Sequence, residues 1–133
     1  MRTNAREAAF KILFATQFSD DAGDTKRAVM GQENLNKNDV DYCNAVLSAV
    51  SENKSEIAKM IDERSRLFPE SRLFPADRSV LFIAIAEIMY FDDIPAAVSV
   101  NEAANIASKY SSEKSATFIS GILSQIIRDR KNV

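Results

Sequence analysis

The sequence predicts an all-α fold, a compact bundle of about six or seven helices. First, an apolar run from Val80 to Phe91 contains one charged residue, Glu87, which is typical of a helix buried by other helices. Second, apolar residues recur at helical spacing through most of the chain. Third, the chain has only 3 glycines and 3 prolines, too few for the many tight turns of a β-sandwich or barrel. At 133 residues it fits a single domain over 1–133 with its own core.

The central helix is expected over 75–91. Its apolar run is too short to span a bilayer, which takes about 20 residues, and too long for a typical strand. Pro75 suits the first turn of a helix, and Asp77 suits the positive end of the helix dipole. We expect Ile85 and Ile88 to be inaccessible to water, each contributing about 1.5–3 kcal/mol through burial before the entropy cost.

Polar residues with capping chemistry mark the starts of other helices. The first helix is expected at Asn4, with Glu7 three residues later in the spacing of a capping box. Ser99 and Glu102 repeat this S-x-x-E pattern. Gly121 lies inside the last helix and is either simply tolerated there or marks a close approach between two helices. Further helices are expected over 25–35, from Asn38, from Ser55 to Pro69, and after the polar loop 111–115.

Composition and charge bear on the compartment and the partners. The lone Cys43 cannot form an internal disulfide, which favours a reducing compartment. Charged residues near the start, such as Arg2 and Glu7, interrupt any signal-peptide core. We therefore expect a cytoplasmic protein with no membrane partner. The net charge of -2 argues against strong binding of nucleic acid by this chain alone, although a local basic patch can still bind it.

Most of the residues used in catalysis and in metal or cofactor binding are missing. The chain has no histidine, and so no imidazole base and no Ser-His-Asp triad. A single cysteine cannot form a CxxC site, and the glycines are too scattered for a phosphate-binding loop. Asp92 and Asp93, like the aspartates within 20–24, are interpreted as solvated loop residues, and Cys43 as a small core residue. We expect a protein without enzyme activity, cofactor or metal.

Basic residues point to one further function. Arg2 and Arg6 are four residues apart, so they lie on one side of the first helix, where positive charge does not suit the helix dipole. Lys109 and Lys114 lie on either side of the start of the polar loop 111–115. From the residues alone, RNA binding and plain solubility both stay open for these side chains.

Two stretches of the chain carry a family signature. Residues 77–123 include DRSVLFIAIAEIMY and then DIPAAVSVNEAANIASKYSSEKSATFISGIL. With NEA at 101–103 and F-x-x-G at 118–121 in this order, the stretch resembles the transcription antitermination factor NusB family. The opening NAREAAFKILFATQ over 4–17 resembles the start of the same family. The resemblance covers most of the chain and is weakest between 20 and 38.

The resemblance implies a fold, a function and a set of contact residues. It implies an all-helical bundle of two subdomains, without catalysis. It also implies binding of the boxA element of ribosomal RNA leader transcripts together with NusE, a small-subunit ribosomal protein, within an RNA polymerase antitermination complex. The contact residues that it implies are Arg2, Arg6, Lys109, Tyr110, Lys114 and Phe118 for single-stranded RNA, and Phe14 and Asp77 for NusE.

The chain departs from the family pattern at several positions. Thr3 and Asn4 stand where further basic residues are common in the family. Phe82 replaces a frequent arginine on the central helix, and Ser120 replaces the usual asparagine before glycine. These departures bear on RNA affinity more than on the fold.

Other interpretations stay open at this stage. Tyr110 and Phe118 also fit as core residues, and Asp77 also fits as a partner of the helix dipole. The whole chain also fits an RNA-targeting domain of an RNA methyltransferase, or a helical interaction module with no RNA role. Whether the free protein forms a homodimer is open as well.

Overall fold

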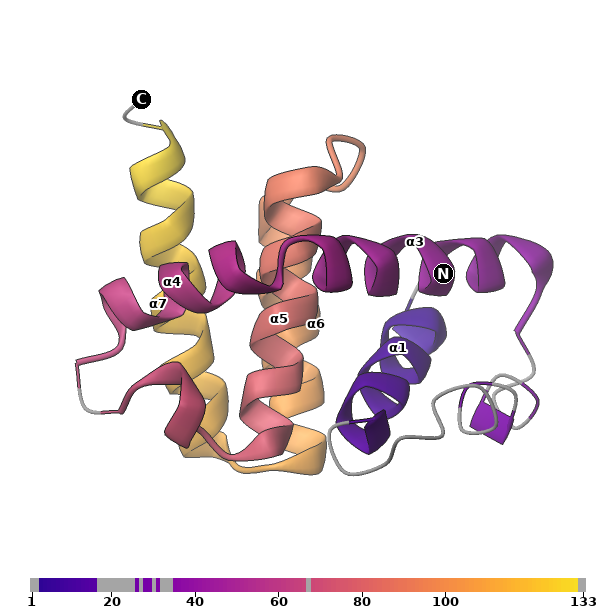
Figure 1. Ribbon diagram of the computed structural model, residues 1–133, viewed down its shortest axis with the longest axis horizontal. Coiled ribbons are helices and arrows are strands. Elements are labelled where there is room, and N and C mark those ends of the chain that lie inside the picture. Colours follow the sequence, from indigo (N-terminus) through magenta and orange to yellow (C-terminus); the bar gives the residue numbers. More distant parts are fainter. Residues whose placement is uncertain are drawn as a thin grey trace.

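The structure, a computed structural model, describes residues 3–16, 26, 28, 29, 31, 35–66 and 68–131. The prediction of an all-α bundle of about six or seven helices is confirmed, because these residues form α-helices, one 3₁₀ turn and no strand. The helix expected over 25–35 falls largely outside the described residues, and Arg2 lies outside them too. The elements are α1 (Thr3–Thr16), α3 (Lys37–Glu52), α4 (Lys54–Arg64), η1 (Glu70–Arg72), α5 (Pro75–Tyr90), α6 (Ala96–Tyr110) and α7 (Glu113–Lys131) (Figure 1).

The predicted central helix is α5, which packs against α1, α3, α4, α6 and α7. It begins at Pro75, as expected, and every side chain from Ser79 to Ile88 is buried. Ile85 and Ile88 are 0% and 3% exposed, which confirms that water does not reach them. Among the described residues, no helix has the length and apolar character needed to cross a membrane.

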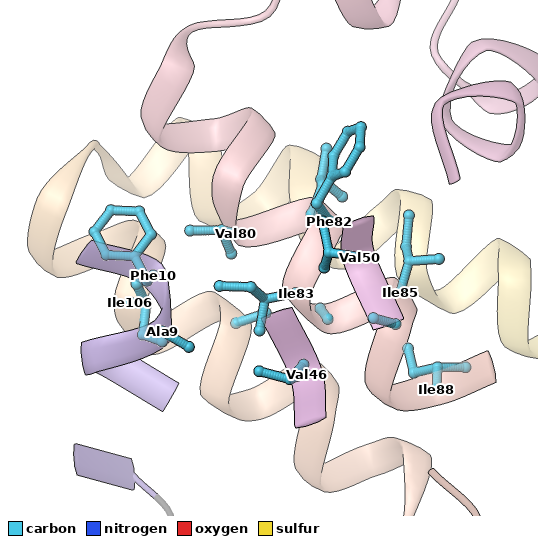
Figure 2. Packing of buried hydrophobic residues seen from close by; sticks show 14 of the residues in the cluster. Ala9, Phe10, Val46, Val50, Val80, Phe82, Ile83, Ile85, Ile88 and Ile106 are labelled. Atoms are coloured by element: carbon cyan, nitrogen blue, oxygen red, sulfur yellow. The ribbon is translucent and has the colours of Figure 1, made fainter. Parts of the chain in front are cut away.

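The core forms where α1, α3 and α6 bring small and branched side chains against α5. Figure 2 shows Ile83 of α5 together with Ala9 of α1 and Val46 of α3, and all three are at most 4% exposed. Ala9 has almost no side chain to hold helices apart, so the backbone of α1 can approach its neighbours closely. The position of α1 therefore depends on this tight packing.

Several expected helix starts are wrong. Asn4 lies inside α1, which begins at Thr3, and Ser99 lies buried inside α6, which begins at Ala96. Pro95 directly precedes α6, and its fixed backbone angle is compatible with the start of a helix without a capping side chain. The two S-x-x-E-like patterns are therefore not capping boxes.

A true capping box opens α3, two residues before the expected cap at Asn38. The side chain of Asn36 accepts a hydrogen bond from the backbone N–H of Asp39 at 2.9 Å. The carboxylate of Asp39 accepts one from the backbone N–H of Asn36 at 3.3 Å. This reciprocal pair satisfies two backbone donors at the start of α3.

The last two loops and Gly121 also differ from expectation. α4 ends at Arg64 and not at Pro69, because the backbone is already extended at Ser65. α7 begins at Glu113, inside the expected loop 111–115, so Lys114 lies in its first turn. A Cβ atom at Gly121 would meet nothing within 4 Å. Gly121 is therefore a tolerated surface glycine and does not mark a close approach of helices.

Candidate functional site

The described side chains of the expected site, apart from Arg6, lie near one end of the bundle. Figure 1 shows the end of α1, the start of α5 and the turn between α6 and α7 at the same end, the lower one in this view. Phe14 lies near the end of α1, Asp77 near the start of α5, and Tyr110 and Lys114 on either side of the turn between α6 and α7. Residues far apart in the sequence thus come to one region of the surface, in two groups.

The first group lies where α1 meets α6, and we call it the α1–α6 seam: Glu7, Phe10, Phe14, Lys109 and Tyr110. The rings of Phe10 and Tyr110 are 5.0 Å apart, and those of Phe10 and Phe14 are 6.0 Å apart. Tyr110 is 36% exposed and Phe14 is 38% exposed. These two rings are therefore held by Phe10 at the surface, and the interpretation of Tyr110 as a core residue is wrong.

One oxygen of Glu7 holds both polar groups of the seam. Glu7 Oε1 accepts a hydrogen bond from Lys109 Nζ at 2.5 Å and from the Tyr110 hydroxyl at 3.0 Å. Burial alone would raise the pKa of Glu7, but the hydrogen bonds from Lys109 and Tyr110 lower it overall. The Glu7 carboxylate therefore stays charged at neutral pH and accepts the hydrogen bonds of both Lys109 and Tyr110.

The second group lines an open groove of about 450 Å³ beside the starts of α5 and α7. Lys114 and Phe118, expected at the RNA surface, and Asp77, expected at the partner surface, share this groove. Two more aromatic side chains border it, Phe68 at 53% and Phe74 at 74% exposed. The groove, called the α5–α7 groove below, is lined by Phe68, Arg72, Leu73, Phe74, Asp77, Ser112, Lys114, Ser115 and Phe118.

Asp77 is buried in the wall of this groove with one oxygen unsatisfied. Its Oδ2 accepts a hydrogen bond from Ser115 Oγ at 3.0 Å, and the side chain as a whole is largely enclosed. Its Oδ1 is buried and has no hydrogen-bond partner among the described residues. A buried acceptor without a partner costs roughly 1–3 kcal/mol. The positive end of the α5 dipole offsets part of this cost, and a donor supplied by a ligand would offset more.

Arg6, which was expected to bind RNA at the surface, is buried inside the bundle. It is 5% exposed, whereas the sequence suggested a surface side chain beside Arg2. Its Nε donates to Glu87 Oε2 at 2.8 Å, and its Nη1 donates to Glu102 Oε1 at 3.2 Å. Burial would lower the pKa of Arg6, but the hydrogen bond and charge of Glu87 raise it. Its guanidinium is therefore committed to carboxylates inside the bundle.

The acceptor of this buried network, Glu87, joins four helices. It receives hydrogen bonds from Arg6 of α1, from the Tyr42 hydroxyl of α3 and, at 2.9 Å, from Ser99 Oγ of α6. Burial and the adjacent charge of Glu87 raise the pKa of Tyr42 far above its usual value, so its hydroxyl remains a donor. This role was missed, although a single charge in an apolar run was a signal for a buried ion pair.

Cys43 behaves as the core residue that was expected. It is fully buried, and its thiol donates to the backbone oxygen of Ala5 at 3.2 Å. Burial raises its pKa to about 11, so the thiolate form is scarce at neutral pH. Among the described residues there is also no group of three or more acidic or cysteine side chains placed to hold a metal ion.

Comparison with known proteins gives a consistent result. The family model described as NusB family matches residues 3–128. The transcription antitermination protein NusB of Natranaerobius thermophilus is 40% identical over 129 residues, which covers 94% of this chain and 93% of that protein. The solved structure of T. maritima NusB is 31% identical, with a TM-score of 0.88 over 96% of this chain and 91% of that one. A crystal structure of the antitermination factors NusB and NusE in complex with double-stranded RNA contains a chain with the same fold, at 23% identity and a TM-score of 0.86, covering 96% of both chains.

Proposed function

Because this chain belongs to the NusB family, we propose that it is a cytoplasmic transcription antitermination factor without catalytic activity. It binds boxA-type single-stranded RNA of ribosomal RNA leader transcripts together with NusE, and the complex acts on RNA polymerase. The observation that carries this proposal is the α5–α7 groove, where Lys114 and Phe118 lie beside Asp77. Proteins bind single-stranded RNA with cations that contact phosphates and aromatic rings that stack on bases, which Lys114 and Phe118 provide. The carboxylate of Asp77 offers a contact for a second partner.

The RNA contacts divide between phosphates and bases. Lys114 is exposed in the first turn of α7 and meets a phosphate, as does Arg2, which lies outside the described residues. Phe118 at the groove and Tyr110 at the seam stack on unpaired bases, a contact worth about 1–3 kcal/mol per base. Lys109 is part of this RNA surface as well, because its ammonium group lies beside the Tyr110 ring. Arg6 is left out, because its guanidinium is buried against Glu87.

NusE contacts the same end of the bundle through Phe14 and Asp77. Phe14 is stacked on Phe10 and still 38% exposed, so it presents a positioned apolar ring to a partner. Asp77 Oδ1 lacks a donor among the described residues, and a donor from NusE would satisfy it once the groove wall adjusts. Asp77 thus lies between NusE and the two side chains of the groove that contact RNA, Lys114 and Phe118.

Neutralising Arg2 and Lys114 together is expected to weaken RNA binding and flatten its salt dependence. Each phosphate contact to a single strand contributes about 0.7 to the slope of log K against log salt concentration. The Arg2→Ala/Lys114→Ala variant should therefore lose about 1.4 of slope, twice that contribution, while its melting temperature stays close to that of the wild type. The measurement is a salt series of boxA RNA binding in the presence of NusE.

Lys37→Ala is the matched control for charge, because Lys37 is an exposed lysine on the first turn of α3. It should leave the salt slope unchanged. An unchanged slope in the Arg2→Ala/Lys114→Ala variant would remove both residues from the RNA surface. A loss in Lys37→Ala of about half the size seen in the double variant, which removes twice the charge, would show that net charge and no particular contact sets the affinity.

A further inference from the structure

The α1–α6 seam has the chemistry of an anion site that the protein fills with its own carboxylate. Lys109 Nζ and the Tyr110 hydroxyl both point to Glu7 Oε1, at 2.5 Å and 3.0 Å. Lys109 and Lys11 also lie beside the Tyr110 ring, with their Nζ atoms 5.3 Å and 6.0 Å from its centroid. Two ammonium groups and a hydroxyl are hydrogen-bond donors of the kind that bind an RNA phosphate.

We propose that Glu7 competes with an RNA phosphate for Lys109 and Tyr110 and thereby limits the affinity of the chain for RNA. The proposal rests on the RNA-binding function given above. It adds that Lys109 and the Tyr110 hydroxyl bind an RNA phosphate only when the Glu7 carboxylate gives up both hydrogen bonds. Glu7 is thus a determinant of affinity that does not itself touch RNA.

The two side chains of this ion pair differ in how far they are exposed to solvent, and therefore to RNA. The Lys109 side chain is 61% exposed, whereas the Glu7 side chain is 13% exposed. RNA can therefore reach the ammonium group from solvent, while the carboxylate stays partly enclosed between the helices. Because a solvent-accessible ion pair is weak, a phosphate can displace the carboxylate from Lys109, at the cost of leaving Glu7 unpaired.

Counterions give the competition a distinct signature. In the wild type, the ion pair with Glu7 keeps Lys109 from the RNA phosphates most of the time, so few of the RNA's counterions are released at this contact. Without a charge at position 7, the same contact releases a cation and steepens the salt slope by about 0.7.

The test is boxA RNA binding with NusE by the full chain and its Glu7→Gln variant, each with and without Lys109→Met. Glu7→Gln should tighten binding roughly threefold to tenfold and steepen the salt slope by about 0.7. Lys109→Met should weaken binding in both backgrounds, but by more in the Glu7→Gln background, where it should also abolish the added slope. The melting temperature of Glu7→Gln reports whether the seam still packs.

Glu56→Gln is the matched control, since Glu56 is an exposed acid on α4, which packs against α3, α5 and α7. An equal gain in Glu56→Gln, or unchanged or weaker binding in a folded Glu7→Gln variant, would overturn the proposal. An effect of Lys109→Met that is the same in both backgrounds would overturn it as well. If the wild type with NusE does not bind RNA at all, the proposed function fails, which is a separate outcome.

Discussion

Substitution of Ile85 by aspartate is expected to abolish the folded state. Ile85 is 0% exposed at the centre of α5, the helix against which five other helices pack. The change removes an apolar burial worth about 1.5–3 kcal/mol and places a carboxyl group where no water can solvate it. The combined loss of more than about 5 kcal/mol would exceed or equal the whole stability of many domains of this size.

The measurement is far-UV circular dichroism with a urea melt. Ile85→Val is the control, expected to lose only about 0.5–1.5 kcal/mol, because it removes a single methyl group. Ile85 is a cleaner position than Ile88, since Arg130 hydrogen-bonds the backbone oxygen of Ile88 and lies close enough to pair with a new acid. A cooperative melt of Ile85→Asp within about 2 kcal/mol of the wild type would contradict the central placement of α5.

Replacing Arg6 by methionine is expected to cost about 3–5 kcal/mol of stability, because it leaves Glu87 buried without its cation. The network around Glu87 ties α1, α3 and α6 to α5, so the loss should be felt as global destabilisation. Methionine replaces the apolar stem of the side chain but not the guanidinium, so most of the loss comes from the missing ion pair. Urea melts at neutral pH provide the measurement.

A second substitution separates the ion pair from packing. In the Arg6→Met/Glu87→Gln variant the buried charge of Glu87 is removed as well, and the amide can still hydrogen-bond Tyr42 and Ser99. Glu102, whose side chain is 14% exposed, still loses its cation. We expect this variant to regain part of the lost stability, which gives a favourable coupling energy in a double-mutant cycle. If Arg6→Met melts like the wild type and instead flattens the salt dependence of RNA binding, Arg6 is a surface contact after all.

The fold could be predicted from the sequence largely because of α5. A run with a single charge between Val80 and Phe91 leaves no polar face for water, so the segment must be buried by other helices. Helix starts were harder to place. Asn36 and Asn38 both have capping chemistry, and only the reciprocal bonds with Asp39 decide between them. The local pattern does not contain that information.

The sequence suggested candidate site residues but not how the fold arranges them. Arg6 was assigned to the surface because a charged residue is seldom buried, and its partner Glu87 lies 81 positions away. Asp77 and Phe118 were assigned to different partners, yet the starts of α5 and α7 bring them into one groove. Contacts of this kind depend on how distant helices pack, which spacing along the chain does not reveal.

The central claim is that this chain binds boxA RNA jointly with NusE, and linkage gives its most direct test. The measurement is a titration of boxA RNA into the chain alone, into the chain with NusE, and into the Asp77→Ala variant with NusE. We expect weak binding by the chain alone, tighter binding with NusE, and loss of most of that gain in Asp77→Ala. The reciprocal titration should show RNA tightening NusE binding by the same factor. Equal RNA affinity in all three mixtures would contradict the account.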